Sequence, residues 1–261
     1  MTNWKRWYKV VFLFILFHII YFGGQFLVEL PAARGDDSWS GILQVVVVFA
    51  MILIFFGGYG WYVEHKVKVG PRFSVPVHIG HLISSVTTGL LLIVVLNLVL
   101  QFILQVLHIV PETAQNQAGI NRMLELNSMS KFVTLFLAVI VAPVCEETIY
   151  RLLLIGPIKT KQVKPTTRHR KRLAVLSWVF FILAHMGQQF YGVIVSPSWN
   201  GTVAAITASL TYGVLSFVLV REYYLHGSLA RSMVIHMSWN ALAAGVLLLN
   251  LNSSDGACTV C

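Results

Sequence analysis

The sequence predicts an all-α membrane protein, a polytopic bundle of about seven transmembrane helices with its N-terminus in the cytoplasm. Three observations lead to this fold class. The chain has 261 residues, of which 57% are hydrophobic and only 11% are charged, whereas soluble domains carry about 25% charged residues. Its mean hydropathy is +0.74. The hydrophobic residues also come in runs of about 20, the length that crosses a hydrocarbon core about 30 Å thick.

Seven apolar runs follow one another along the chain, and each is long enough to cross the bilayer. Their predicted limits are 10–28, 42–63, 79–106, 132–155, 173–195, 202–220 and 229–251. The first run is too long for the hydrophobic region of a signal peptide, so we expect it to be a retained anchor. We therefore predict a single integral membrane domain over residues 1–261, with accessory spans at about 10–106 and a core at about 130–251.

The basic residues alternate between the two sides of the predicted membrane. They gather at the N-terminus and after the second, fourth and sixth spans, whereas the other connections carry few of them. The basic residues on the first side are Lys5, Arg6, Lys9, Lys66, Lys68, Arg72, Lys159, Lys161, Lys164, Arg168, Arg170, Lys171, Arg172, Arg221 and Arg231. Cytoplasmic loops are enriched in Lys and Arg, so this side faces the cytoplasm and the C-terminus lies outside. Topology therefore accounts for the net charge of +9, and we expect no nucleic-acid partner.

Three charged residues lie well inside the fourth span: Glu146, Glu147 and Arg151. A charge near the bilayer centre costs about 2.5–3.5 kcal/mol on insertion scales and usually marks a site in the bundle interior. Glu147 and Arg151 are four residues apart, so they share a helix face and can pair. Glu146 is rotated about 100° from Glu147 and is left for another partner. A purely stabilising ion cluster is the alternative, but one Glu–Arg pair would suffice for that.

Two other spans carry polar side chains at a similar depth. His185 lies in the fifth span, and His236 and Asn240 share one face of the seventh. With a rise of 1.5 Å per residue, Glu146 lies about 13 Å from the cytoplasmic end of its span, His185 about 18 Å and His236 about 10 Å. These depths overlap, so the polar groups can form one cluster in the cytoplasmic half of the membrane. His18, in the first span, is expected only to hydrogen-bond to a neighbouring helix.

These residues also form three motifs. Glu146-Glu147-Thr-Ile-Tyr-Arg151 fits EExxxR, Phe181-Ile-Leu-Ala-His185 fits FxxxH, and His236-Met-Ser-Trp-Asn240 fits HxxxN. Each motif is weak alone, but the three together occur in one order, each in an apolar span. In this respect the chain resembles the CPBP family, which comprises CAAX proteases and bacteriocin-processing enzymes and is also called the Abi family. The resemblance covers the fourth to seventh spans, and the first three spans carry no motif.

The resemblance implies an intramembrane endopeptidase in the cell membrane, acting on a peptide or a membrane-protein substrate among lipids. By this analogy Glu146 and His185 activate the hydrolytic water, and His236 and Asn240 hold the oxyanion. Glu147 and Arg151 form a supporting pair, and Phe181 belongs to the same supporting set. General chemistry agrees, because peptide hydrolysis needs a base for water, a proton for the amine and donors for the oxyanion. A role in bacteriocin self-immunity or processing is a further implication.

The metal requirement stays open at this stage. Family members have been discussed both as metalloproteases and as metal-independent glutamate proteases. A divalent metal such as zinc would need at least three ligands at one point, and Glu146, His185 and His236 would supply them. The sequence lacks His-Glu-x-x-His, so the chain is not an ordinary zincin. We favour a metal-independent mechanism, because His236 and Asn240 on one face suit an oxyanion clamp.

Two other functions compete with the protease. The first is a non-catalytic immunity or regulatory protein on the same scaffold, which would keep the fold without needing an intact cluster. The second is a transporter, which is weaker because the halves show no repeat and no pair of broken helices marks a midplane site. The complete set of motifs favours the enzyme over both. The oligomeric state, the substrate and the cleavage site are not indicated by the sequence.

The predicted orientation can be tested with the tail cysteine. The alternating bias in basic residues places Cys261 outside the cell and the 159–172 connection in the cytoplasm. We expect a membrane-impermeant thiol reagent to label Cys261 in intact cells. Labelling of Cys261 only after permeabilisation would show that the orientation is the reverse of the predicted one.

Overall fold

The computed structural model describes residues 4–67, 79–109, 115–156 and 167–257. These residues form α- and π-helices, and they contain no strand. The elements are α1 (Trp4–Arg34), α2 (Trp39–Val67), α3 (Ile79–Val106), α4 (Gln115–Leu126), α5 (Ser128–Phe136), η1 (Leu137–Val141), α6 (Ala142–Glu147), η2 (Thr148–Ile155), α7 (Thr167–Val195), α8 (Trp199–His226) and α9 (Leu229–Ala257). Seven stretches of this part of the chain are long and apolar enough to cross a membrane. The predicted fold class is therefore confirmed.

Most of the helices extend beyond the limits that hydropathy gave. The first continues from residue 28 to Arg34, and the last continues from residue 251 to Ala257. Hydropathy marks only the apolar part of a helix, whereas the backbone hydrogen bonds continue until something ends them. At the end of α1 this is Gly35, whose φ of +64° is a left-handed conformation common just after a helix.

The connection before the fourth span contains a helix that hydropathy did not predict. This helix, α4, is short and polar, so it has neither the length nor the composition of a span. It ends at Asn127, where α5 begins. The Asn127 side chain accepts a hydrogen bond from the Ser130 amide at 2.8 Å and donates one to the Ala32 carbonyl at 3.0 Å. Asn127 therefore caps α5 and ties it to the end of α1.

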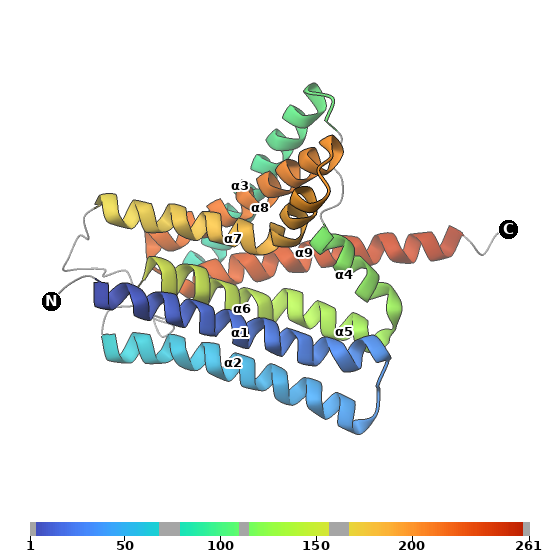
Figure 1. The fold of residues 1–261 in the computed structure, drawn as a ribbon, viewed down its shortest axis with the longest axis horizontal. Coiled ribbons are helices and arrows are strands. Elements are labelled where there is room, and N and C mark those ends of the chain that lie inside the picture. The colour runs from blue at the N-terminus through green and yellow to red at the C-terminus, as the bar shows by residue number, and fades with distance from the viewer. Residues whose placement is uncertain (1–3, 68–78, 110–114, 157–166, 258–261) are drawn as a thin grey trace.

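The fourth span lies in the middle of the bundle. It consists of α5, η1, α6 and η2, and it contacts α1, α2, α7 and α9. More than half of its most apolar stretch is buried, whereas the first, second, third, fifth and seventh spans are largely exposed. Figure 1 shows these helices running along the long axis, with α3 and α8 rising obliquely from them. The charged residues of the fourth span are thus placed where other helices can surround them.

The fourth span is also not a regular α-helix. Two π-helical segments, η1 and η2, flank the short α6 that carries Glu146 and Glu147. In η1 the Ala142 amide donates to the Leu137 carbonyl, five residues back. Such π turns occur frequently at functional sites. The sequence analysis expected a continuous helix here, because hydropathy carries no information on which amide bonds which carbonyl.

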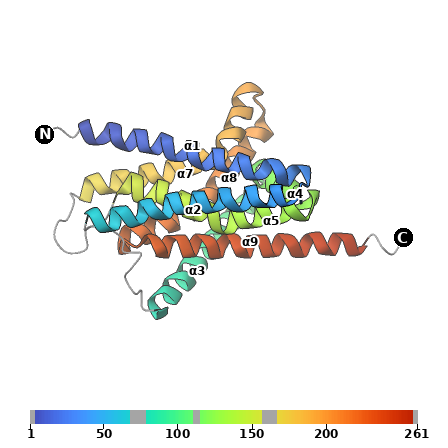
Figure 2. The ribbon, with the colours of Figure 1, turned by 90° about the horizontal axis from the view of Figure 1, so that it is seen from below.

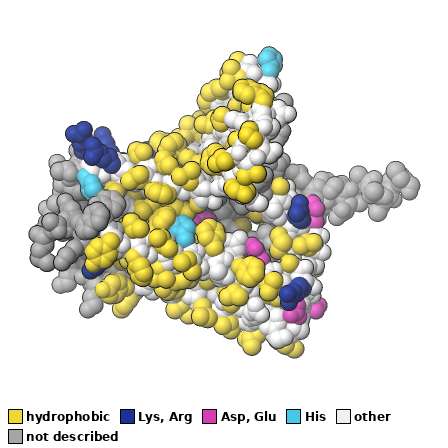
Figure 3. Space-filling model, viewed as in Figure 1, with side chains coloured by type: hydrophobic (Ala, Val, Ile, Leu, Met, Phe, Trp, Pro, Cys, Tyr) yellow, Lys and Arg dark blue, Asp and Glu magenta, His cyan; other side chains and the backbone are white. Residues whose placement is uncertain are grey.

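The surface agrees with a membrane environment. Hydrophobic side chains cover the middle of the face in Figure 3, and Lys and Arg side chains lie toward its two ends. Figures 1 and 2 show the two termini at opposite ends of the bundle, as an odd number of spans requires. The cytoplasmic assignment of the N-terminus stays a prediction. Several residues on which it rests lie outside the described residues: Lys68, Arg72, Lys159, Lys161, Lys164 and the test residue Cys261.

Candidate active site

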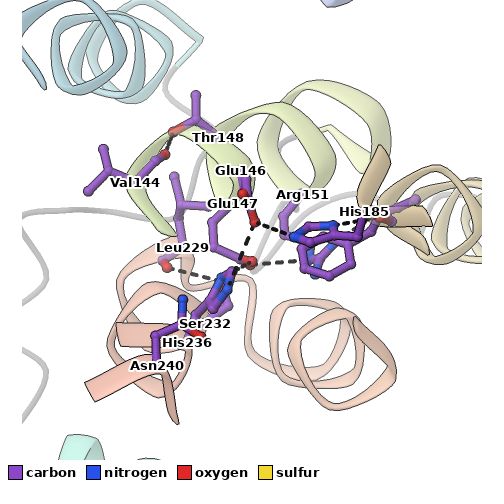
Figure 4. A network of polar contacts seen from close by, with 12 residues as sticks. Val144, Glu146, Glu147, Thr148, Arg151, His185, Leu229, Ser232, His236 and Asn240 are labelled. Atoms are coloured by element: carbon purple, nitrogen blue, oxygen red, sulfur yellow. Dashed lines mark hydrogen bonds and ion pairs between the residues drawn. The ribbon is translucent and has the colours of Figure 1, made fainter. Parts of the chain in front are cut away.

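The three sequence motifs come together in the interior of the bundle. Glu146 and Glu147 end α6, Arg151 follows in η2, His185 lies on α7, and His236 with Asn240 lies on α9. Figure 4 shows these side chains pointing toward one another from the three helices. The predicted convergence of depth is therefore matched by convergence in space.

Glu147 is held by a basic residue on one side and an imidazole on the other. Its Oε2 lies 3.1 Å from Arg151 Nε, and its Oε1 lies 3.1 Å from His236 Nδ1. The Glu147 and Arg151 side chains are fully buried. Arg151 also donates from Nη1 to Ser177 Oγ at 3.1 Å. The predicted pairing of Glu147 with Arg151 is confirmed, and the pair extends to the seventh span through His236.

Phe181 is the aromatic centre around which the charged side chains pack. It is fully buried, and its ring stacks on His185 with centroids 4.3 Å apart. The Arg151 guanidinium lies 5.0 Å from the ring centroid, and the His236 ring centroid lies 5.8 Å away. The flat face of an aromatic ring attracts cations. The Phe181 ring thus packs against both imidazoles and the guanidinium.

Glu146 faces a phenol and two imidazoles. Its Oε1 accepts a hydrogen bond from Tyr21 Oη at 3.0 Å. Its Oε2 lies 3.6 Å from His185 Nε2 and 3.9 Å from His236 Nε2. Both separations exceed a direct hydrogen bond, and Oε2 accepts none from the described residues. The two oxygens of this carboxylate therefore have different surroundings: one is anchored and the other is available.

The hydrogen-bond partner of Nδ1 shows which ring nitrogen of each histidine carries the hydrogen. His185 Nδ1 lies 2.8 Å from the Phe181 carbonyl, and His236 Nδ1 lies 3.1 Å from Glu147 Oε1. A carbonyl and a carboxylate can only accept, so each Nδ1 carries the hydrogen. In the neutral ring, Nε2 then has a free lone pair. Each histidine consequently presents Nε2 to Glu146.

Asn240 has a structural partner that follows from the π turn. Residue 143 would bring its amide to the Ala138 carbonyl in a π turn, but Pro143 has no N–H. Asn240 Nδ2 donates to the Ala138 carbonyl at 2.8 Å instead. A primary amide carries two N–H groups, so this bond leaves one for another acceptor. Asn240 thus completes η1 while its side chain lines the cavity beside Glu146.

A cavity of about 800 Å³ opens onto the cluster. Residues from α1, α4, α7, α8, α9 and the fourth span line it, and most of them are apolar. Glu146, His185, His236 and Asn240 lie together on its wall, and neither Lys nor Arg is among the described lining residues. Figure 3 shows a hollow in this face, with acidic side chains visible within a hydrophobic surround. Ligand sites commonly have this form, with few polar groups in an apolar wall.

The donor set matches zinc in type but not in arrangement. Zinc accepts one carboxylate and two imidazoles in some hydrolases, and Glu146, His185 and His236 offer these groups. In the described part of the chain, however, no group of three or more His, Cys, Asp or Glu side chains is placed to hold a metal ion.

Two hydrogen bonds from α1 complete the cluster, and one of them, made by His18, was predicted from the sequence. His18 accepts a hydrogen bond from Tyr150 Oη at 2.9 Å, because its Nδ1 donates to the Phe14 carbonyl. Its expected role as a bond to a neighbouring helix is confirmed. Tyr21 was missed, because a tyrosine in an apolar span has no distinguishing feature. The spacing of Tyr21, Gln25 and Glu29, four residues apart, was the one available signal, since it places polar groups on one face of α1.

Comparison with known proteins gives a family match for the motif-bearing part of the chain. Residues 128–242 match the family described as "Type II CAAX prenyl endopeptidase Rce1-like". This part of the chain is similar to the type II CAAX prenyl endopeptidases. The match includes all three motifs and thereby confirms the resemblance on which the sequence analysis relied. It also identifies a family of membrane proteases, whose substrates are peptides. No curated protein and no solved structure gives a match.

The buried pair gives a prediction about stability. Arg151→Ala leaves Glu147 as a buried charge without its cationic partner, a defect that costs about 3–5 kcal/mol. We expect a marked fall in the unfolding temperature of the detergent-purified protein and in its folded yield.

A double variant supplies the control. Arg151→Met combined with Glu147→Gln removes both charges, and the glutamine oxygen can still accept from His236 Nδ1. Replacing both partners is often close to neutral, so we expect much of the lost stability to return. A single Arg151→Ala variant as stable as the parent would contradict this account of the pair.

Proposed function

We propose that the chain hydrolyses a peptide bond within the membrane, with Glu146 as the general base. The observation that supports this most strongly is the position of Glu146 Oε2. It is buried on the wall of the cavity, accepts no hydrogen bond from the described residues, and faces the Nε2 atoms of His185 and His236 at 3.6 and 3.9 Å. A single water molecule commonly bridges polar atoms at separations beyond direct contact. The nucleophile would lie among these three atoms.

In the proposed reaction, one carboxylate first accepts a proton and then donates the same proton. Glu146 takes a proton from the water molecule while the water oxygen forms a bond to the carbonyl carbon of the substrate. The same proton then passes to the amide nitrogen as the carbon–nitrogen bond breaks and the amine leaves. His185 accepts a hydrogen bond from the water through Nε2, which orients the oxygen for attack. A positioned acid or base of this kind contributes about 10²–10⁴ in rate.

The seventh span would stabilise the oxyanion. His236 can donate from Nε2 when both ring nitrogens carry a proton, and the Glu147 carboxylate at its Nδ1 holds the ring in place, as the orienting acid of a catalytic triad does. The second N–H of Asn240 is the other donor. Two donors aimed at the developing charge act strongly in a site that excludes water. Arg151 has an indirect part, since it holds Glu147 in place.

The cavity supports a substrate with a large apolar group near the scissile bond. Its walls are mostly apolar and its volume is about 800 Å³, which exceeds the needs of a small peptide side chain. The matched family is named for prenyl substrates, so a farnesylated C-terminal peptide is a suitable first probe beside its unmodified counterpart. Bacteriocin processing or immunity stays a prediction from the resemblance, since nothing in the site identifies such a substrate.

The catalytic assignment is tested by Glu146→Gln. The amide keeps the shape of the carboxylate but cannot take up the proton, so we expect peptide cleavage to fall by about 10²–10⁴ with little change in unfolding temperature. Product release is followed by mass spectrometry on protein in lipid vesicles. Glu125→Gln is the control, because Glu125 is exposed on α4 away from the cavity and its loss should leave cleavage unchanged.

The histidine variants separate catalysis from support. His185→Ala should resemble Glu146→Gln, with cleavage lost and stability kept. His236→Ala should lose cleavage and some stability as well, because it removes the donor to buried Glu147. A folded Glu146→Gln protein with its full biological effect would favour the non-catalytic immunity or regulatory module instead.

The metal question has its own test. We expect activity to survive treatment with a strong chelator, with less than stoichiometric zinc in the active protein by elemental analysis. Stoichiometric zinc whose removal abolishes cleavage, and whose return restores it, would show that a metal-dependent mechanism is correct.

A further inference from the structure

Tyr21 belongs to a helix outside the family match, yet it contacts the proposed base. Its hydroxyl lies 3.0 Å from Glu146 Oε1, and its side chain is buried at 6% exposure. An ionised carboxylate has no hydrogen to give, so the phenol donates. The matched region is 128–242, and α1 ends at Arg34. The accessory part of the chain thus supplies a direct partner to the motif residue.

The contact between α1 and the fourth span is fixed at two points. Tyr21 donates to Glu146, and His18 accepts from Tyr150. His18 and Tyr21 are three residues apart on α1, and Glu146 and Tyr150 are four apart on the fourth span, so each pair lies on one helix face. Two hydrogen bonds across one interface fix both the rotation and the register of α1 against the fourth span.

Helix α1 also packs on α2 close to Tyr21. A Cβ atom at Gly24 would lie 2.5 Å from Ile52 Cδ1 on α2, so the Ile52 side chain fills the space that a larger residue would need. Gly24 is three residues beyond Tyr21. Glycine at position 24 therefore lets α1 pack against α2 within one turn of Tyr21.

The division of the two carboxylate oxygens shows what Tyr21 does. Oε1 is bound by the phenol, while Oε2 faces both imidazoles at 3.6 and 3.9 Å. A carboxylate bound at one oxygen cannot rotate freely about its terminal bond. We propose that Tyr21 is a positioning residue for the reaction, which holds Glu146 so that Oε2 is presented to His185 and His236. This inference rests on the proposed role of Glu146.

The test is Tyr21→Phe, which removes the hydroxyl and keeps the ring. We expect kcat per folded molecule to fall by about 10- to 100-fold, the scale of a small misplacement of a reacting group, while KM stays close to the parent value. Tyr223→Phe is the control. It removes another buried phenol, bonded to the Gly156 carbonyl at 3.1 Å, and should affect stability alone. An unchanged kcat in folded Tyr21→Phe protein would overturn the proposal.

Two further measurements keep the proposal testable on its own. Infrared spectra identify the Glu146 carboxylate band as the one lost in Glu146→Gln. That band should move in Tyr21→Phe and stay in place in Tyr223→Phe, whether or not any peptide is cleaved. Fluorinated tyrosine at position 21 preserves the packing and changes only the strength of the donor, so kcat should vary with the substitution. A stationary band, or a kcat independent of fluorination, would refute the positioning role.

Discussion

The buried charge of Glu147 is the constraint on which the site depends. Apolar surroundings cannot stabilise an isolated carboxylate, so Glu147 requires Arg151 and His236 at 3.1 Å each. Those two contacts bind η2 and α9 to the end of α6. They also assign the Nδ1 hydrogen of His236, which leaves Nε2 facing Glu146. Glu147 therefore also determines the orientation of the His236 ring beside Glu146.

The neighbouring carboxylate, that of Glu146, has no such cationic partner on its own helix. Glu147 has a cationic partner within its own helix, whereas Glu146 is surrounded by Tyr21, His185 and His236. Two adjacent residues are rotated about 100° from one another, so a single dipeptide reaches two separate environments. One environment pairs its carboxylate with a cation, and the other leaves one carboxylate oxygen without a hydrogen bond from the described residues. This separation lets one short α-helical segment supply both a buried ion pair and a carboxylate on the cavity wall.

Much of this arrangement could be predicted from the sequence, because the membrane makes polar residues informative. Hydropathy gave the seven spans, and helix periodicity gave the Glu147–Arg151 pair. The common depth of Glu146, His185 and His236 anticipated their meeting. Helix ends were less predictable, because the backbone hydrogen bonds of a helix continue beyond its apolar residues. The π turns and α4 were missed, because hydropathy reports neither amide partners nor short polar helices. Tyr21 was missed because its role depends on which helix face meets Glu146, and periodicity within one helix cannot reveal that.

The contacts of α1 have a consequence for the order in which the chain is made. His18 and Tyr21 are separated from Tyr150 and Glu146 by 132 and 125 residues. A ribosome that adds about 5–20 residues per second reaches the fourth span on the order of ten seconds after the first. During that interval the first helix has two polar side chains in or near lipid and no partner for them on the fourth span. The accessory helix is thus synthesised well before its partners on the fourth span, so the Glu146 carboxylate is fixed only when two parts of the chain made at different times have met.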